Sequence, residues 1–108
     1  MVKINQGDII VMDFNPQQGH EQMGRRLALV LSNDVLNNHS SLILVCPITN
    51  TNKEHPFHIP LDDRTETTGV ILCDQAKMLD VRARNAQYKE KCPEDIWEEA
   101  KDMIMSFL

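Results

Sequence analysis

The sequence lacks the features that take a chain into or across a membrane. It has no apolar run near the roughly 18 residues needed to span a bilayer, and its first residues, MVKINQGD, contain no apolar signal segment. The three cysteines, Cys46, Cys73 and Cys92, lack the number and spacing of a disulfide framework or a zinc cluster. We therefore expect a cytoplasmic protein whose Cys46 and Cys73, each ending an apolar run, act as small buried hydrophobes.

Several signatures of catalysis are also missing. The chain has no Gly-rich phosphate loop and no nucleophile elbow, because Ser32 follows a predicted strand without flanking glycines. His55 and His58 flank a proline, so they cannot share a helix face as a zinc-protease pair does, and His20 with Glu21 is a lone pair of potential ligands. We therefore expect no bound metal and no cofactor.

The chain has little positive charge to offer. Its net charge is −5, which argues against a strong non-specific grip on duplex DNA. Six of the sixteen acidic residues lie between positions 90 and 102, so the remainder is close to neutral. A local basic groove therefore stays possible, formed by Arg25, Arg26, Arg82 and Arg84.

What the chain does have is a succession of short apolar runs separated by polar turns. Its 108 residues, 42% hydrophobic and 25% charged, suit a single soluble domain over residues 1–108. The runs predict strands at 8–14, 27–31, 42–46, 57–61, 70–73 and 76–81. Pro47 is expected to close the third strand, and Pro60 confines the fourth to an edge or an end. Ser32 or Asn33 is expected to cap a short helical turn through residue 38.

The C-terminus changes to a helical period. Pro93 suits a first helical position, and Glu94 and Asp95 suit the first turn, where the helix dipole favours acids. From Ile96 to Phe107, apolar residues recur at i, i+4, i+7, i+8 and i+11, as in an amphipathic helix with a solvated acidic face. The predicted fold is mainly β, a small barrel or strongly bent antiparallel sheet closed by this helix.

The stretch around which we expect the rest of the chain to be organised is residues 15–31, a polar Gly-containing loop followed by an apolar run. The run predicts a strand buried on both faces. Arg25 and Arg26, at the end of the loop, should therefore lie directly before the start of a core strand. In a hairpin, the start of this strand lies opposite the end of the third, where Thr49 stands. Arginine with threonine can clamp an oxyanion or a phosphate. The alternative is a surface loop with solvated arginines and a threonine that caps a turn.

Short motifs occur in a specific order along nearly the whole chain, and together they resemble the MazF/PemK (Kid) toxins of bacterial toxin–antitoxin systems. The motifs are Gly7-Asp8-Ile9, Asp13-x-Asn15-Pro16, Gly19-His20-Glu21-Gln22-x-Gly24-x-Arg26, Leu29-Val30-Leu31-Ser32, Asn37, Pro47-Ile48-Thr49, Thr68-Gly69-Val70, Asp74-Gln75 and Asp80-x-x-Ala83-Arg84.

The resemblance implies a fold, an activity and partners. The fold is a small SH3-like barrel, or twisted antiparallel sheet, shared with the CcdB gyrase poisons. The activity is metal-free, sequence-specific cleavage of single-stranded RNA, usually mRNA, leaving 2′,3′-cyclic phosphate and 5′-hydroxyl ends. Members form homodimers, and apolar residues on both faces of the first strand are compatible with an interface. The cognate antitoxin fills the RNA groove with an acidic, initially disordered tail; operator DNA is reached only through the antitoxin, and no membrane is involved.

The resemblance also assigns residues. Arg26 and Thr49 match the catalytic arginine and threonine, and Glu21 matches a loop acid implicated in activity. His20 and Asp74 match positions discussed for the PemK/Kid branch. The general base stays open between Glu21, His20, water and a substrate group. We expect RNA contacts from Gln17, Gln18, Gln22, Arg25, Asn50, Asp74, Gln75 and Arg84.

The chain departs from the family pattern at two positions. Leu27 stands where the family usually has proline after the catalytic arginine, and Leu72 stands where the Kid branch often has arginine, so the Kid catalytic scheme transfers poorly. Two alternatives remain: a weak or silent relative that binds antitoxin and co-represses its operon, and a gyrase poison on the same fold. The poison's Trp-Gly-Ile tail is missing, because the chain ends Ser106-Phe107-Leu108 and Trp97 falls inside the predicted helix.

Overall fold

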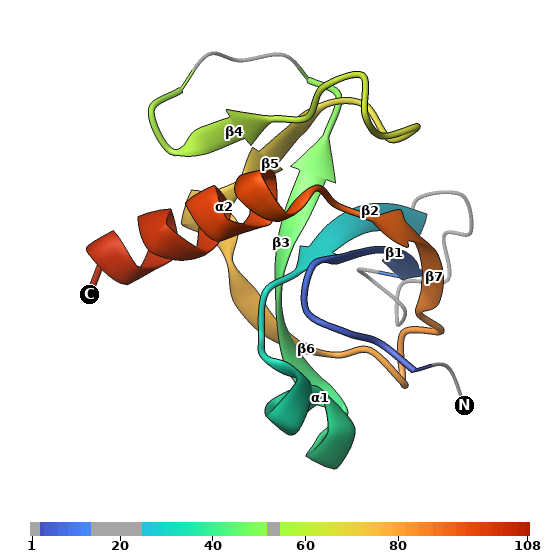
Figure 1. The fold of residues 1–108 in the computed structure, drawn as a ribbon. Helices are drawn as coiled ribbons and strands as arrows, with labels where there is room; N and C mark the ends of the chain where they lie inside the picture. Colours follow the sequence, from blue (N-terminus) through green and yellow to red (C-terminus); the bar gives the residue numbers. More distant parts are fainter. Residues whose placement is uncertain (1–2, 14–24, 52–54) are drawn as a thin grey trace.

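The fold is one antiparallel sheet with a helix packed across one face (Figure 1). The computed structural model describes residues 3–13, 25–51 and 55–108. Its strands run in the order β4-β5-β3-β2-β1-β7, with β6 paired to the remaining part of β3, and the path is not closed into a barrel. The strands are β1 (Asp8–Asp13), β2 (Arg25–Val30), β3 (Leu42–Thr49), β4 (His58–Pro60), β5 (Val70–Leu72), β6 (Lys77–Asp80) and β7 (Gln87–Lys91). The helices are α1 (Asp34–His39), the 3-10 turn η3 (Cys73–Gln75) and α2 (Glu94–Ser106).

Strand β3 is the longest, and it carries two partners along one side. Its first half pairs with β6 as far as Val45, and its second half pairs with β5 from Ile48 onward. The prediction that Pro47 closes this strand was wrong. Pro47 falls in the interval between the two partners, where no strand on that side needs the N–H that proline lacks. The continuation of β3 through Pro47 is what brings Thr49 into the sheet.

The sheet has a buried apolar cluster on each face. Ile9 and Leu29 belong to the cluster that α2 covers with Ile96 and Ala100. Ile10 and Val30 belong to the other cluster, which also contains Ile4 and Val81. The prediction that the second strand is buried on both faces is therefore confirmed. Ile9, Ile10 and Met12 of the first strand are buried within this chain, and Val11 is half-buried. The homodimer remains a prediction.

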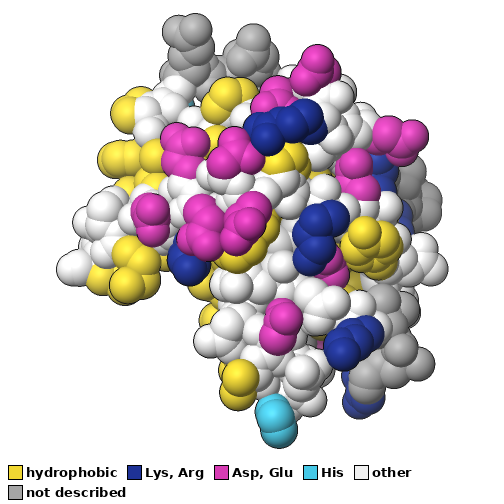
Figure 2. Space-filling model, viewed as in Figure 1, with side chains coloured by type: hydrophobic (Ala, Val, Ile, Leu, Met, Phe, Trp, Pro, Cys, Tyr) yellow, Lys and Arg dark blue, Asp and Glu magenta, His cyan; other side chains and the backbone are white. Residues whose placement is uncertain are grey.

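The two α-helices follow their sequence signals closely. The Asn33 side chain accepts a hydrogen bond of 2.9 Å from the Leu36 N–H and caps α1, as predicted. Pro93, predicted at the first helical position, stands instead at the N-cap, so α2 begins one residue later than predicted. Acidic side chains gather along the exposed side of α2, which agrees with a solvated acidic face (Figure 2). In the described part of the chain, none of the helices is long and apolar enough to cross a membrane.

Strand β7 is the one strand that the sequence analysis missed. Its residues, QYKEK, are mostly charged or polar and have no apolar alternation. They form a strand because they pair with the edge of β1, where Asp8 lies opposite Lys91 and Val11 opposite Gln87. β7 lies at one edge of the sheet and β4, with Pro60, lies at the other, which confirms the edge position predicted from Pro60.

Candidate active site

The site begins with the pairing of β2 and β3. Leu27 lies opposite Ile48 and Ala28 opposite Pro47, so one further step along each strand sets Arg26 beside Thr49. Residues directly opposite in an antiparallel pair share a face and have Cβ atoms about 4.5–5.5 Å apart. The predicted hairpin relationship between the start of the second strand and the end of the third is therefore confirmed.

Arg26 and Thr49 continue one face of the sheet beyond its core. Ala28 and Val30, two and four residues after Arg26, belong to the buried cluster on that face. Arg26 is exposed, and Thr49 is half-buried. The Arg26 guanidinium and the Thr49 hydroxyl therefore lie at the boundary between the apolar core and solvent, where a ligand can reach them.

The two neighbouring arginines differ in their surroundings. Arg25 is paired with Asp13, its Nη1 lying 3.0 Å from Oδ1, and the same nitrogen donates to the Asn85 carbonyl at 3.2 Å. The Arg26 side chain has no hydrogen bond or ion pair with any of the residues that the structure describes. Among the described residues, Arg25 has side-chain partners and Arg26 has none, so Arg26 is the arginine that we expect to meet a ligand.

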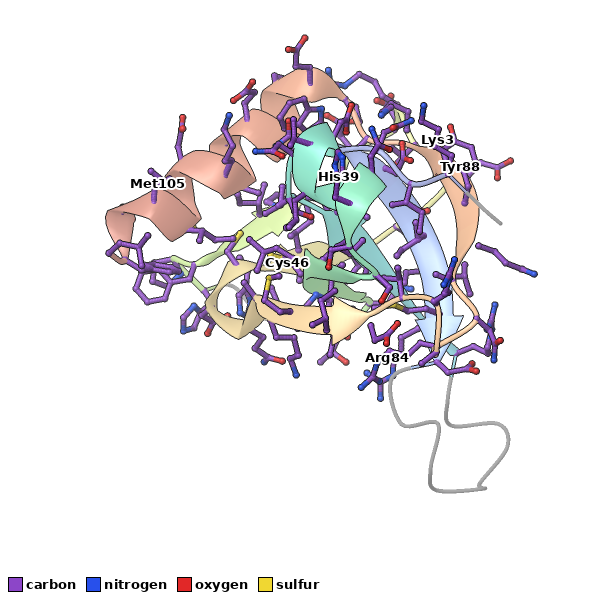
Figure 3. All side chains as sticks on the ribbon, turned by 90° about the horizontal axis from the view of Figure 1, so that it is seen from below. Lys3, His39, Cys46, Arg84, Tyr88 and Met105 are labelled. Carbon is purple, nitrogen blue, oxygen red and sulfur yellow. The ribbon has the colours of Figure 1, made fainter. Side chains whose placement is uncertain are left out.

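Asp13 holds the ends of β1 and β2 together. Its carboxylate accepts from the Asn85 side chain at 3.1 Å and from Arg25, and these bonds, led by that of Asn85, lower the pKa of Asp13. Its carbonyl oxygen accepts from Arg84 Nη1 at 3.1 Å, so Arg84 lies at the same end of the sheet (Figure 3). Asn85 adopts φ = 55°, a left-handed conformation that asparagine tolerates. Sequence reasoning missed Asn85 and the anchoring role of Asp13, because only the fold brings residues 13, 25 and 85 together.

Thr49 is held by a short network at the end of β3. Its Oγ1 accepts a hydrogen bond of 3.2 Å from the Thr51 N–H, and its neighbour Asn50 accepts one of 2.7 Å from the Thr68 hydroxyl. Across the ladder Thr49 lies opposite Val70. Gly69, with φ = 117°, lets the preceding loop pass directly over the Thr49 backbone. The Thr68-Gly69-Val70 motif therefore supports the threonine end of the site.

The other predicted RNA contacts fall into two groups. Asp74 and Gln75 lie in η3, beyond the end of β5 that is remote from Thr49, and Asp74 bonds to His58. Gln17, Gln18, His20, Glu21 and Gln22 lie outside the described residues. The structure thus brings together Arg25, Arg26, Thr49, Asn50 and Arg84, and it places Asp74 and Gln75 elsewhere in the chain.

A groove of about 580 Å³ shares only Asn85 with the network around Asp13. Its lining includes Lys3, His39 and Arg82, between α1 and the turn before β7 (Figure 3). Neither Arg26 nor Thr49 borders it. The chemistry of the paired strand ends, rather than this groove, marks the candidate active site.

Comparisons with known proteins agree with this geometry. Residues 5–108 match the family described as the PemK-like, MazF-like toxin of type II toxin–antitoxin systems. The chain belongs to this family. It is 43% identical over 83 residues to the endoribonuclease toxin MazF of Escherichia coli strain K12, covering 77% of this chain and 74% of that protein. It is 32% identical over 109 residues to the endoribonuclease PemK of Escherichia coli, covering 97% and 82%.

Solved structures of the family share the fold. In a crystal structure of MazE–MazF from Deinococcus radiodurans, the matched chain superimposes with a TM-score of 0.88 at 33% identity, over 98% of this chain and 96% of that one. The mainly antiparallel sheet with a C-terminal helix is therefore the fold of MazF. In this MazF-like chain, Leu27 lies in both the β1–β2 and the β2–β3 ladders, opposite Val11 and Ile48. Strand β2 begins at Arg25, two residues earlier than predicted, so Arg26 is a strand residue here.

Proposed function

We propose that this chain is an endoribonuclease toxin that cleaves single-stranded RNA, chiefly mRNA in the cytoplasm, at specific sequences and without a metal. The observation that carries the proposal is the placement of Arg26 beside Thr49 at the open end of the sheet. Family membership supports it, because the relatives MazF and PemK are named endoribonucleases.

The proposed reaction uses the substrate's own 2′-hydroxyl as the nucleophile. Its oxygen attacks the adjacent phosphorus and loses its proton to a base, and the bond from phosphorus to the 5′-oxygen breaks. The products are a 2′,3′-cyclic phosphate and a 5′-oxygen that takes up a proton to become a hydroxyl. DNA lacks the 2′-hydroxyl, so DNA is not cleaved.

Arg26 and Thr49 stabilise the charge that develops on the phosphoryl oxygens. A guanidinium donates two parallel hydrogen bonds and stays charged at every relevant pH, and the Thr49 hydroxyl donates a third to the same group. Donors aimed at developing charge are each worth about 100- to 1,000-fold in turnover. The base is Glu21 or His20, with water or a substrate group as the remaining candidates.

Arg25 and Arg84 are proposed to contact the RNA backbone beside the reacting phosphate, since both lie at the Arg26 end of the sheet. Asn50 lies next to Thr49 and is proposed to contact a flanking nucleotide, and Gln17, Gln18 and Gln22 are proposed to read bases. Asp74 and Gln75 are proposed as more distant contacts. The net charge of −5 favours a single strand bound at a local site over duplex bound by general attraction.

The proposed partners are a second copy of the chain and a cognate antitoxin with an acidic tail, which competes with RNA for the arginines. Leu42 and Met78 lie on the same face of the β3–β6 ladder, diagonally opposed, and are 49% and 48% exposed. Val35 on α1, which packs beside β3, is 71% exposed. Exposed apolar side chains of this size are commonly covered by a partner, and they support a homodimer whose formation light scattering would test.

The test is cleavage of a long single-stranded RNA in EDTA by the wild type, Arg26→Ala and Thr49→Ala, with analysis of the RNA ends. We expect site-selective cuts with cyclic-phosphate ends, and a loss of at least about 100-fold in each variant. A substrate with a single 2′-deoxy nucleotide at the cut site should be inert. Glu21→Gln and His20→Gln test the base, and full turnover in both would remove these two residues from the mechanism.

Two outcomes would contradict the proposal. A folded wild type that cuts none of several RNAs would favour a silent antitoxin-binding relative, and Leu27→Pro would then test whether the family proline restores activity. Cleavage that survives in both Arg26→Ala and Thr49→Ala would place the chemistry elsewhere on the chain.

A further inference from the structure

A cluster of metal-ligating side chains lies away from the Arg26–Thr49 pair. His55, His58 and Asp74 each offer one ligand atom, and these atoms all lie within 4.8 Å of one another. His58 begins β4, opposite Leu72 on β5, and Asp74 follows β5 in η3. The sequence analysis set His55 and His58 aside because they cannot share a helix face. The fold brings them together across a turn and adds Asp74 from a distant segment.

We propose that His55, His58 and Asp74 form a binding site for one divalent transition-metal cation of the zinc type. Two imidazole nitrogens and a carboxylate oxygen are a donor set that suits zinc and its neighbours better than magnesium or calcium, which prefer oxygen ligands. Three protein ligands leave one tetrahedral position for water. The proposal does not rest on the ribonuclease function, because neither Arg26 nor Thr49 takes part.

The spacing of the fixed half of the site fits a metal. His58 Nε2 lies 3.2 Å from Asp74 Oδ1. Ligands at zinc bond lengths of about 2.0–2.2 Å in a tetrahedron are separated by roughly 3.3 Å. An ion can therefore enter between these two atoms with little movement of either side chain.

His55 is the adjustable ligand. Its ring stacks on that of His58, with centroids 4.5 Å apart and an angle of 26° between the planes. Since the lone pairs of an imidazole lie in the plane of the ring, His55 must turn about its side-chain bonds to point at the same ion. His55 is exposed, and its Nδ1 accepts a hydrogen bond of 3.2 Å from the Phe57 N–H, so Nε2 is the nitrogen left to bind the ion.

The second ring nitrogen of His58 points away from Asp74. This atom, Nδ1, is buried and has no hydrogen-bond partner among residues 3–13, 25–51 and 55–108. The second nitrogen of a metal-binding histidine is usually bonded to water or to a protein acceptor, so we expect a water molecule beside Nδ1 when Nε2 holds an ion. The Phe57 ring packs against that of His55, with centroids 5.3 Å apart, and against the Phe107 ring, with centroids 5.0 Å apart.

The test uses the full chain without a histidine tag, stripped with EDTA, dialysed, and titrated with Co²⁺ and Zn²⁺. We expect one ion per chain, a visible Co²⁺ spectrum of the tetrahedral type that Zn²⁺ abolishes, and a raised melting temperature with saturating Zn²⁺. His55→Gln and Asp74→Asn should each weaken binding at least about tenfold. Both side chains are accessible, and circular dichroism would verify that these variants fold.

The matched control is His39→Gln, which removes an exposed histidine on α1 and should leave binding unchanged. Binding that is lost in His39→Gln or in His20→Gln would assign the ion to those residues and overturn the proposal. Affinity that is unchanged in both His55→Gln and Asp74→Asn, or no binding by the folded wild type, would overturn it as well.

Discussion

Gly69 approaches Thr49 so closely that a methyl group on its Cα would stand 2.3 Å from the Thr49 carbonyl oxygen. The neighbouring atom is backbone, so it cannot turn aside. Gly69 also holds φ = 117°, which side-chain-bearing residues rarely adopt. The threonine of the candidate active site is therefore positioned by a residue that contributes no side chain of its own.

Gly69→Ala should lower both stability and turnover. The strained backbone and the contact with Thr49 should reduce the free energy of unfolding by about 1–3 kcal/mol. The steric clash can be relieved only if β3 moves at Thr49. We therefore expect the kcat of each folded molecule on RNA to fall as well. Urea unfolding and single-turnover cleavage measure the two effects, and a destabilised variant with wild-type turnover would show that Gly69 does not position Thr49.

Gly7→Ala is the matched control for that experiment. Gly7 also has a positive φ, 89°, and an added methyl group would stand 2.6 Å from Trp97 Nε1, under the start of α2. We expect a comparable loss of stability and unchanged turnover per folded molecule, because Gly7 contacts neither Arg26 nor Thr49. Equal losses of turnover in both variants would indicate a general effect of destabilisation.

Arg26→Lys and Arg25→Lys should separate the two arginines. Lysine keeps the charge but loses the two parallel donors, so Arg26→Lys should lower kcat by about 100-fold or more. Arg25 is already paired with Asp13, so Arg25→Lys should mainly raise KM for RNA. The reverse result would identify Arg25 as the catalytic arginine.

Glu90 should make stability depend on pH. Burial alone would raise its pKa, but hydrogen bonds from the Thr67 hydroxyl at 2.6 Å, the Thr67 N–H at 2.7 Å and the Glu66 N–H at 3.1 Å lower it below 4.5. A lowered pKa in the folded state stabilises the fold above the unfolded pKa, and this contribution is lost as pH falls through the folded value. Glu90→Gln should therefore cost about 1–2 kcal/mol at pH 7 and progressively less below about pH 4.5.

The measurement for Glu90 is urea unfolding at several pH values. Glu66→Gln is the control, because that side chain is 90% exposed and only its backbone N–H bonds to Glu90. A difference between wild type and Glu90→Gln that stays constant down to pH 3 would contradict the assignment.

The three thiols should be inert in the folded protein. Burial raises the pKa of Cys92 to about 12, and the hydrogen bond with Cys73 together with burial raises that of Cys46. The same hydrogen bond lowers the pKa of Cys73, so the protection of that thiol rests on its burial. All three side chains are buried, and the thiolate is the reactive form. At pH 8 we expect an alkylating reagent to modify them only in denaturant, as mass spectrometry would report, and rapid labelling of the native protein would contradict this.

The sequence predicted the parts of the fold in which local chemistry and final structure agree. Three features could be predicted because the residues that form them are close together in the sequence. They are the strand from the apolar run 27–31, the Asn33 cap of α1 and the helix with its apolar period from Ile96. β7 and the continuation of β3 past Pro47 could not be predicted that way, because each depends on a neighbouring strand. The same limit applies to the functional residues. The proximity of Arg26 and Thr49 could be predicted because the second and third strands form a hairpin. Asn85 and the His55–His58–Asp74 cluster could not, because they depend on contacts between distant segments.

Strand β1 obtains its second neighbour only from β7, near the other end of the sequence. The Cys92 N–H also donates to the Gly7 carbonyl oxygen at 2.8 Å, and Ile96 and Ala100 complete the cluster beneath α2. Closing so long a loop is slow, since its entropic cost comes before the contacts that repay it. A chain emerging from the ribosome therefore cannot complete this sheet until residues 87–106, which form β7 and α2, are outside the exit tunnel.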